Sequence, residues 1–353
     1  MLGFSGEKVA LGPEELRSFL GDASRYLAQA IARARKDDGL YHTYFFYEVT
    51  EYEFVRDEAG NQIHQDGLPL VRPLAFRRHH LPHFLEGQIH ALGVVEPSEA
   101  RRLYQAVRAS DLYDTGLGLY KINASLAGAP PAIGRVTRFL PGWLENESIW
   151  IHLNYKYLLA LLRAGLYEEF FTEMRQVLVA FHPPERYGRN PLEHSSFIVS
   201  SAHPDRRLHG RGFYARLTGA TAEFLSMYLI MTGLARAFVL DEAGEPRFRP
   251  RPILPDWLFT SAPRKVTLQT EESQVELDLP AGTFASRLFG GGLLIYYNPQ
   301  RKPTFGPEAA KVVRFVLTDR EGRQTCFEGD TLPAAESRGL REGRYVRVEI
   351  TLA

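Results

Sequence analysis

The spacing of apolar residues changes along the chain, and this change limits the fold more than any other feature. Up to the segment PRFRPRPILPDW (246–257), apolar residues recur at i, i+3, i+4 and i+7, whereas past Asp256 and Trp257 they alternate. The first period is typical of amphipathic helices and the second of strands. The sequence therefore predicts a helical part over 1–256 and a β-domain over 257–353.

The helical part contains several stretches of good amphipathic pattern. We predict helices over the following ranges: Pro13 to about Gly39, 97–109, 147–164, 166–181 and 219–235. Only Gly165 separates the third from the fourth, and so short a connection makes neighbours antiparallel. This part is therefore predicted to consist of helical hairpins.

Long aromatic segments separate these helices, at 39–75, 110–146 and 182–218. Loops of this length are uncommon in compact domains unless they carry function or have their own structure, so we expect them to line a site. Residues 41–55, followed by the turn DEAGNQ, are predicted to form a β-hairpin inserted among the helices.

The β-domain is predicted to be small and antiparallel. Its expected strands are 265–270, 274–279, 293–297, 312–318, 324–327 and 345–351, separated by turn signals such as DREG and LREG.

Composition narrows the class of protein. The 42 basic and 42 acidic residues give no net charge, which argues against a nucleic-acid binder. Cys326 is the single cysteine, so the chain forms neither an internal disulfide nor a zinc cluster of cysteines. The first residues lack the pattern of a signal peptide, and no apolar stretch approaches a membrane span. We expect a cytoplasmic protein.

Most standard catalytic motifs are absent. The sequence contains no GxSxG, no GxxxxGK[ST], no HExxH and no GxGxxG that follows a strand and opens a helix. Gly290, Gly291 and Gly292 precede an expected strand, so no helix end is available there to bind phosphate.

Two expected helix starts carry polar residues. In PGWLENESIWIH (141–152), Glu145 to Ser148 are predicted to open a helix whose inner face includes Ile149 and His152. In LTGATAEF (217–224), Thr218 to Thr221 are predicted to open a second one. Helix starts offer free backbone N–H groups to an anion. The alternatives are an ordinary core histidine and a simple threonine N-cap.

The segment between these two helix starts, residues 187–212, is rich in polar groups. It holds His194, His203 and His209 together with four arginines and several hydroxyls. These groups are suited to sugar or phosphate binding, because sugars need many directional hydrogen bonds. Alternatively, they satisfy one another and the loop backbone.

At these residues the sequence resembles inverting glycoside phosphorylases of the cellobiose phosphorylase type. The shared motifs come in the order of the family: DTGLGLYKIN (114–123), IGR (133–135), PG (141–142), ENESIWIH (145–152) and LTGATAEF (217–224). The resemblance covers Leu112 to Trp257. The loop 187–205 and the segment YYNPQRKPTFG (296–306) look closest to members that act on β-1,2-linked oligoglucans, including the phosphorylase-like region of cyclic β-1,2-glucan synthases.

The resemblance implies a fold, a reaction and a site. The fold would be mainly α, the carboxyl-terminal portion of an (α/α)6 barrel of helical hairpins, followed by a small antiparallel β-sandwich. The reaction would be cleavage of a β-glucoside by inorganic phosphate, with inversion, to give α-glucose 1-phosphate.

The resemblance also assigns residues to the two substrates. His152 and Thr221 would hold the phosphate, with Gly219 and Ala220 contributing backbone groups. The sugar would contact the following residues: Glu145, Asn146, His209 and Arg211.

The sequence departs from the family pattern at the general acid. An inverting hydrolase needs two carboxylates, whereas phosphate is already an anionic nucleophile and one general acid suffices. The family's general acid is an aspartate in an upstream Trp-Asn-Asp segment that this sequence lacks. We therefore assign no catalytic residue, cofactor or metal, and expect a fragment inactive alone that associates with the missing part or with another copy.

Two other classes of function remain open. The chain could be a carbohydrate-binding or scaffold protein that has lost the chemistry of the family. It could also be an inverting glycoside hydrolase, which would need two carboxylates about 6.5–9.5 Å apart across a pocket.

Overall fold

The computed structural model describes residue 6 and residues 8–215, 218–269, 274–288 and 291–353. These residues divide into two compact units. The first comprises residues 1–166 and 172–220, and the second comprises 167–171 and 221–353. The strands that follow the expected boundary at 256 all lie in the second unit.

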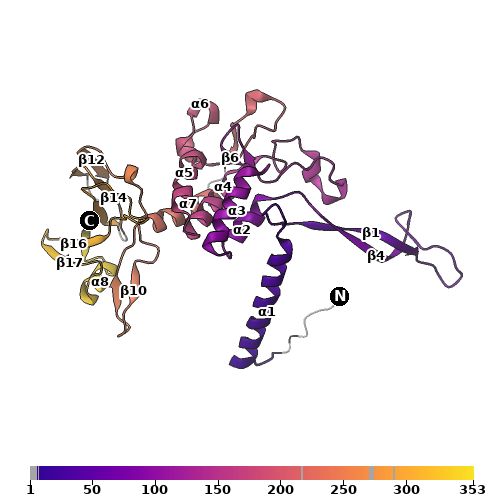
Figure 1. Ribbon diagram of the computed structural model, residues 1–353, viewed down its shortest axis with the longest axis horizontal. Coiled ribbons are helices and arrows are strands. Elements are labelled where there is room, and N and C mark those ends of the chain that lie inside the picture. Colours follow the sequence, from indigo (N-terminus) through magenta and orange to yellow (C-terminus); the bar gives the residue numbers. More distant parts are fainter. Residues whose placement is uncertain (1–5, 7, 216–217, 270–273, 289–290) are drawn as a thin grey trace. The chain divides into compact units, whose positions relative to one another are not determined.

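The fold is mixed, and the prediction of a mainly α protein with a partial (α/α)6 barrel is wrong. About 33% of the chain is helical and about 27% is in strands, which form several small sheets (Figure 1). Each expected helix has a counterpart near its predicted range, but the helix Leu85–Leu92 was not expected, and most segments between the helices were predicted as loops. Many of them pair as short strands, because their aromatic and β-branched residues favour extended backbone.

Five helices of the described residues lie wholly in the first unit. They are α1 (Pro13–Ala34), α2 (Leu85–Leu92), α3 (Pro97–Ala109), α4 (Ile151–Arg163) and α6 (Pro184–Tyr187). Helix α4 is buried along most of its length and packs against α2. Two further helices, α5 (Tyr167–Val177) and α7 (Thr218–Met231), each contribute residues to both units. The helices expected at 97–109 and 166–181 are confirmed, the second with an earlier end.

A long ribbon forms the hairpin expected after residue 41. Strands β1 (Phe45–Phe54) and β4 (Val71–His80) pair antiparallel along their whole length (Figure 1). The short strands β2 (His64–Gln65) and β3 (Leu68–Pro69) form a second hairpin between them. Most ribbon side chains are exposed, and no residue of α1 is buried.

Two small sheets support α4. Strand β5 (Tyr113–Asp114) pairs with β6 (Leu119–Tyr120). Strand β8 (Ser195–Ile198) lies between β7 (Ile149–Trp150) and β9 (Gly212–Ala215), antiparallel to both. The segments 110–146 and 182–215 are thereby held beside the beginning of α4.

The second unit is built around a five-stranded sheet in the order β14-β15-β18-β16-β17. Its strands are β14 (Thr283–Arg287), β15 (Leu293–Tyr297), β16 (Val312–Asp319), β17 (Gln324–Glu328) and β18 (Tyr345–Leu352). Strands β15 and β18 run parallel, so the expected antiparallel sandwich is wrong in this respect. On β18, Val348, Ile350 and Leu352 are buried on one face, while Arg347 and Glu349 lie on the other.

The remaining elements of the second unit are two hairpins and a helix. They are β10 (Phe238–Leu240) with β11 (Pro246–Phe248), β12 (Arg264–Gln269) with β13 (Gln274–Leu279), and α8 (Ala334–Arg341). Helix α8 packs against β11, where the Ser337 hydroxyl accepts a hydrogen bond of 2.8 Å from the Phe248 backbone N–H. The strands expected at 293–297, 312–318, 324–327 and 345–351 are confirmed. Thr270, the last residue of another expected strand, lies outside the described residues.

Candidate functional site

The segment 141–150 turns sharply before α4. Gly142, Leu144 and Glu147 all have positive φ, at 77°, 48° and 53°. A Cβ atom on Gly142 would lie 2.6 Å from the backbone nitrogen of His203, so no larger residue fits there without a shift. The two non-glycine residues adopt a backbone conformation that is uncommon for them, and the surrounding contacts hold it.

These turns correct the prediction that Glu145 to Ser148 open a helix. Helix α4 begins only at Ile151, because Ile149 and Trp150 pair with Ile198 and Phe197 of β8. Ile149 and His152 therefore do not share a helix face. Glu145 and Asn146 lie in the turn that precedes the short strand β7.

Asn123 fixes the shape of this turn. Its side-chain Nδ2 donates to the backbone oxygen of Glu145 at 2.9 Å, and its Oδ1 accepts from the backbone N–H of Glu147 at 2.7 Å. Asn123 is fully buried, so both bonds are shielded from water. The last residue of the DTGLGLYKIN motif thus holds the ENESIWIH motif in place.

Both glutamates of the turn are engaged in ion pairs. The Arg135 Nε donates to Glu145 Oε2 at 3.0 Å, and Lys121 Nζ donates to Glu147 Oε1 at 3.1 Å. The Lys121–Glu147 pair is largely buried, whereas Arg135 is mostly exposed. Three motifs of the resemblance, DTGLGLYKIN, IGR and ENESIWIH, are therefore linked by direct contacts.

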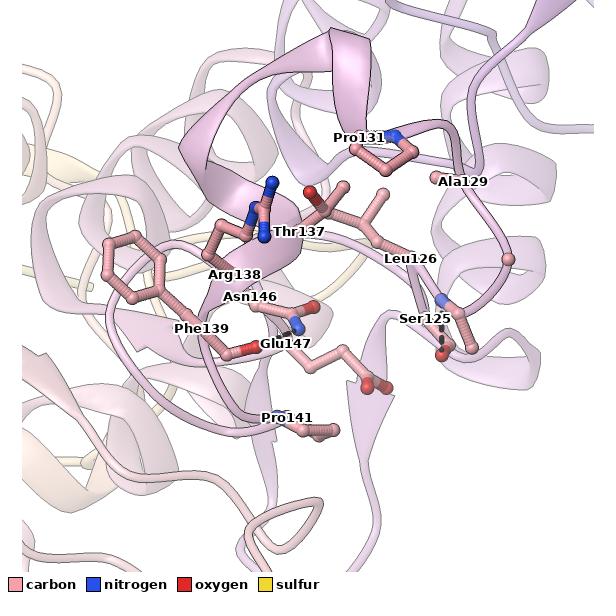
Figure 2. Close-up of a pocket in the computed structure, with 12 residues that line it drawn as sticks. Ser125, Leu126, Ala129, Pro131, Thr137, Arg138, Phe139, Pro141, Asn146 and Glu147 are labelled. Carbon is pink, nitrogen blue, oxygen red and sulfur yellow. Dashed lines mark hydrogen bonds between the residues drawn. The ribbon is translucent and has the colours of Figure 1, made fainter.

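A pocket of about 340 Å³ lies beside this turn (Figure 2). Its lining residues are Ser125–Ala129, Pro131, Thr137–Phe139, Pro141, Asn146 and Glu147. The Asn146 Nδ2 donates to the backbone oxygen of Phe139 at 2.8 Å, and Figure 2 shows the Oδ1 turned away from this bond. That Oδ1 is buried without a hydrogen-bond partner among the described residues. It could therefore accept a hydrogen bond from a donor group of a ligand.

The beginnings of α4 and α7 approach each other at His152 and Gly219. A Cβ atom on Gly219, in the first turn of α7, would lie 3.1 Å from the Cβ of His152, in the first turn of α4. Side-chain carbons rarely come so close, so glycine permits this approach. The N-cap of α4, Trp150, makes no side-chain cap hydrogen bond, and its ring packs edge-on at 5.2 Å from the imidazole of His152.

The other predicted site residues lie on several elements. Ala220 is buried, next to Gly219 in α7. Thr221 follows as an exposed residue of α7 that belongs to the second unit. His209 donates through Nε2 to the backbone oxygen of His203 at 2.7 Å, and Arg211 is exposed beside Gly188. The described contacts link Glu145 and Asn146 to neighbouring segments of the turn. A separate contact brings His152 close to Gly219.

Asp114, the first residue of the motif DTGLGLYKIN, was assigned no role of its own from the sequence, yet it organises the neighbouring loops. Its Oδ1 accepts from the backbone N–H of Gly116 at 3.0 Å and from the Ser201 hydroxyl at 2.6 Å, and its Oδ2 accepts from the Ser201 N–H at 2.7 Å. Asp-Thr-Gly is a recognisable turn signal that could have indicated the local part of this role. The partner in the distant loop left no trace in the sequence.

The electrostatics of the loop 200–209 are also local. Hydrogen bonds from the side chain and backbone of Arg207 lower the pKa of Asp205 to about 2. The Nδ1 of His203 accepts the backbone N–H of Asp205 at 3.0 Å, which places the proton of the neutral ring on Nε2. Asp205 is therefore ionised beside His203 throughout the physiological range.

Comparison with known proteins adds no assignment, since no protein-family model and no curated protein matches the chain. Within the described ranges, we find no helix with the length and apolar character needed to span a bilayer.

Proposed function

We propose that the chain is the phosphate-binding part of an inverting glycoside phosphorylase, which uses inorganic phosphate to cleave a β-glucoside and releases α-glucose 1-phosphate. The observation that carries the proposal is the approach of His152 to Gly219, because it joins the beginnings of two helices within the first unit. His152 belongs to the motif 145–152, which direct contacts link to the motifs 114–123 and 133–135 of the resemblance.

The N–H groups at the start of a helix can bind an anion. The first backbone N–H groups of a helix have no intrahelical acceptor, and the helix dipole makes this end positive. The N-cap residue of α4 is Trp150, whose side chain has no acceptor oxygen and makes no cap hydrogen bond to these donors. A protonated imidazole at residue 152 would add a charge-assisted hydrogen bond to a bound phosphate.

Thr221 keeps its predicted role as a second phosphate ligand, on the basis of the resemblance alone. The predicted roles of His209 and Arg211 at the sugar rest on the same basis.

The sugar is proposed to bind at the turn that precedes β7. The unpartnered Asn146 Oδ1 and the pocket beside it support this, because sugar hydroxyls are donors that such an acceptor needs. Glu145 is paired with Arg135 and could accept a further hydroxyl.

The engaged carboxylates favour phosphorolysis over direct hydrolysis. Glu145 and Glu147 are both ion-paired, and Asp114 accepts backbone and hydroxyl donors at both oxygens. Each of the three is thus held by protein partners, which disfavours it as the base that would activate water in an inverting hydrolase. In the family that the sequence resembles, the proton donor is an aspartate in an upstream Trp-Asn-Asp segment. The reaction would therefore require such a segment.

The proposal is tested by an assay of glucose 1-phosphate release from β-1,2-linked and other β-glucan oligomers. We expect release when the chain is combined with an upstream segment that carries the general acid, and none from the chain alone. The combination with the variant His152→Ala should lose release. Absence of release in every combination would contradict the proposal.

A second candidate is a carbohydrate-binding protein without catalysis, which the pocket next to Asn146 favours. It predicts that oligoglucans bind equally well with and without phosphate, and that His152→Ala leaves their affinity unchanged. Titration calorimetry with both variants separates the two functions.

A further inference from the structure

One row of side chains crosses the whole five-stranded sheet of the second unit. Neighbouring residues in the register pair in sequence from strand to strand: Arg287 on β14, Leu293 on β15, Arg347 on β18, Thr318 on β16 and Gln324 on β17. Residues paired in this way lie next to each other on the sheet. Two arginines, a hydroxyl and an amide are thus aligned within one row.

This row lines a pocket of about 310 Å³. Its other lining residues are Leu277, Gly291, Gly292, Gly322 and Val346. The two arginines are the only charged residues among these ten described residues, which together carry a positive charge. The volume falls at the lower end of the range for small-molecule sites and exceeds the space of a single ion.

Two polar atoms of the row lack hydrogen-bond partners among the described residues. They are the Oγ1 of Thr318 and the Nε of Arg347, and both are buried. Glu349 Oε2 lies 3.0 Å from Arg347 Nε, close enough for an ion pair but outside hydrogen-bond geometry. Buried polar groups are normally satisfied, so the unbonded Thr318 hydroxyl beside the Arg347 guanidinium indicates a missing partner.

Glu349 does not line the pocket, and its carboxylate interacts with both Arg347 and Tyr297. Its Oε1 accepts a hydrogen bond of 2.8 Å from the Tyr297 hydroxyl, and Glu349 is not among the lining residues. A guanidinium carries five N–H donors, and the ion pair with Glu349 leaves the terminal ones of Arg347 able to bind a ligand oxygen. Its side chain is 33% exposed, so a ligand can reach them.

We propose that this pocket binds a small organic anion through its phosphate or carboxylate oxygens. The anionic group lies between Arg287 and Arg347, where planar guanidinium groups match two oxygens at once. Thr318 and Gln324 contact further oxygens of the ligand, and Leu277, Leu293 and Val346 cover its carbon frame. A sugar phosphate and a sugar acid both have this chemistry.

Titration calorimetry of the full chain tests the site with four probes: glucose 1-phosphate, inorganic phosphate, glucuronate and glucose. We expect the two sugar anions to bind, and inorganic phosphate to bind this site more weakly because it lacks a carbon frame. Neutral glucose should not bind here. Glucose 1-phosphate and glucuronate distinguish a phosphate ligand from a carboxylate ligand.

Variants locate the binding in the sheet. Arg287→Gln should weaken the affinity for the sugar anions about tenfold, since it removes one charge-assisted contact. Thr318→Val should weaken it less and keep the volume of the side chain. Arg314→Gln, which removes an exposed charge from β16 outside the pocket, is the matched control and should bind as the unmodified chain does.

Binding at this pocket is independent of the proposed phosphate site in the first unit. In His152→Ala the sugar anions should still bind at the sheet, whereas Arg287→Gln should leave phosphate binding at His152 intact. Unchanged affinity of both sugar anions in Arg287→Gln and Thr318→Val, or equal affinity for glucose and glucose 1-phosphate, would overturn the proposal.

Discussion

At the scale of single residues, the contact between His152 and Gly219 is the most demanding feature of the candidate site. The backbone of α7 approaches α4 so closely that any side chain at 219 would press on His152. A small residue is therefore needed at this position to keep the two helix starts together, whatever ligand they bind.

Gly219→Val should displace the first turn of α7 from His152. We expect phosphate to lose its protective effect on thermal unfolding, while the circular dichroism spectrum stays close to that of the unmodified chain. Gly21→Ala is a control in the middle of α1, where a Cβ meets only the end of the Arg25 side chain at 4.0 Å. It should keep the protection, with a stability gain of about 0.5–1 kcal/mol from helix propensity. Protection that persists in Gly219→Val would argue against the site.

A second residue-scale feature is the buried carboxylate of Glu173. Its Oε1 accepts from the Tyr104 hydroxyl at 2.7 Å and from Arg108 Nη1 at 2.9 Å. Burial raises the pKa of Glu173, and the hydrogen bond from Tyr104 and the charge of Arg108 offset this only in part. The carboxylate therefore holds α3 to α5 within the first unit.

Glu173→Ala should lower the free energy of unfolding by about 1–3 kcal/mol, because it leaves the Tyr104 hydroxyl and the partly exposed Arg108 without their buried acceptor. Urea unfolding measures this change. Glu14→Ala removes an exposed glutamate from α1 and should change the same quantity by less than about 0.5 kcal/mol. Equal effects of the two substitutions would show that the Glu173 contacts are of little consequence.

At the scale of elements, three histidines stack at the base of the β1–β4 ribbon. The ring of His42 lies 4.4 Å from that of His80 and 4.5 Å from that of His83, and His83 Nε2 bonds Asp38 Oδ2 at 2.8 Å. The backbone bonds from His42 to Ala34 and from Leu81 to Tyr44 join α1 and the ribbon at the same point.

The stack makes this junction sensitive to pH. Burial lowers the pKa of His42, and the nearby charges of His83 and Lys36 lower it further, against the opposing effect of Asp38. Burial, His42, Lys36 and Arg78 lower the pKa of His80. The folded chain thus binds fewer protons than the unfolded chain, in which the pKa of histidine is about 6.5. The stack's contribution is complete above that pH and is lost as the pH falls through the lowered values.

We expect amide exchange at the base of the ribbon to accelerate as the pH is lowered below about 6.5, after correction for the intrinsic rate. His80→Phe keeps a stacking ring but removes one titrating group, so its pH dependence should be weaker. His64→Gln on the exposed strand β2 should behave as the unmodified chain does. An unchanged pH dependence in His80→Phe would rule out the stack as its cause.

The sequence predicted elements well where one period continues over many residues. The ranges of α3, β13 and β15 agree with their expected residues, because the apolar pattern of each is regular. The prediction of a helix from residue 147 was wrong at its start. There the positive φ of Glu147 and the pairing of Ile149 with Ile198 replace the first helical turn. Neither a left-handed turn at glutamate nor a partner about fifty positions away can be read from local periodicity.

At the scale of the whole molecule, the partial (α/α)6 barrel that the family resemblance implied is wrong. Regular helices indicate only that apolar stripes must be buried, and the same stripes can pack on small sheets, as α4 does on β7 and β8. The candidate site was predicted in part, since the motifs 114–123, 133–135 and 145–152 do meet through Asn123, Lys121 and Arg135. Its pocket and the role of Asp114 depend on contacts between distant loops.

The exposed apolar surface of the first unit leads us to predict association. Helix α1 has no buried residue, and Phe19 and Tyr26 on its apolar stripe are 67% and 66% exposed. Exposed apolar patches of this kind are typical of interaction sites. Sedimentation velocity should show an assembly with another copy, or with the proposed upstream segment when that is supplied. Phe19→Glu together with Tyr26→Glu should give a monomer, and Arg25→Glu should not. A monomer at all concentrations, with no binding of the proposed upstream segment, would contradict this.

The central claim is that the beginnings of α4 and α7 hold one phosphate. Hydrogen exchange of the backbone amides of residues 151–154 and 219–220, with and without inorganic phosphate, tests it most directly. The account predicts that phosphate slows exchange at both helix starts together, and that His152→Ala abolishes the effect at both while leaving the second unit unchanged. Phosphate that leaves both helix starts unprotected, or that protects them equally in His152→Ala, would contradict it.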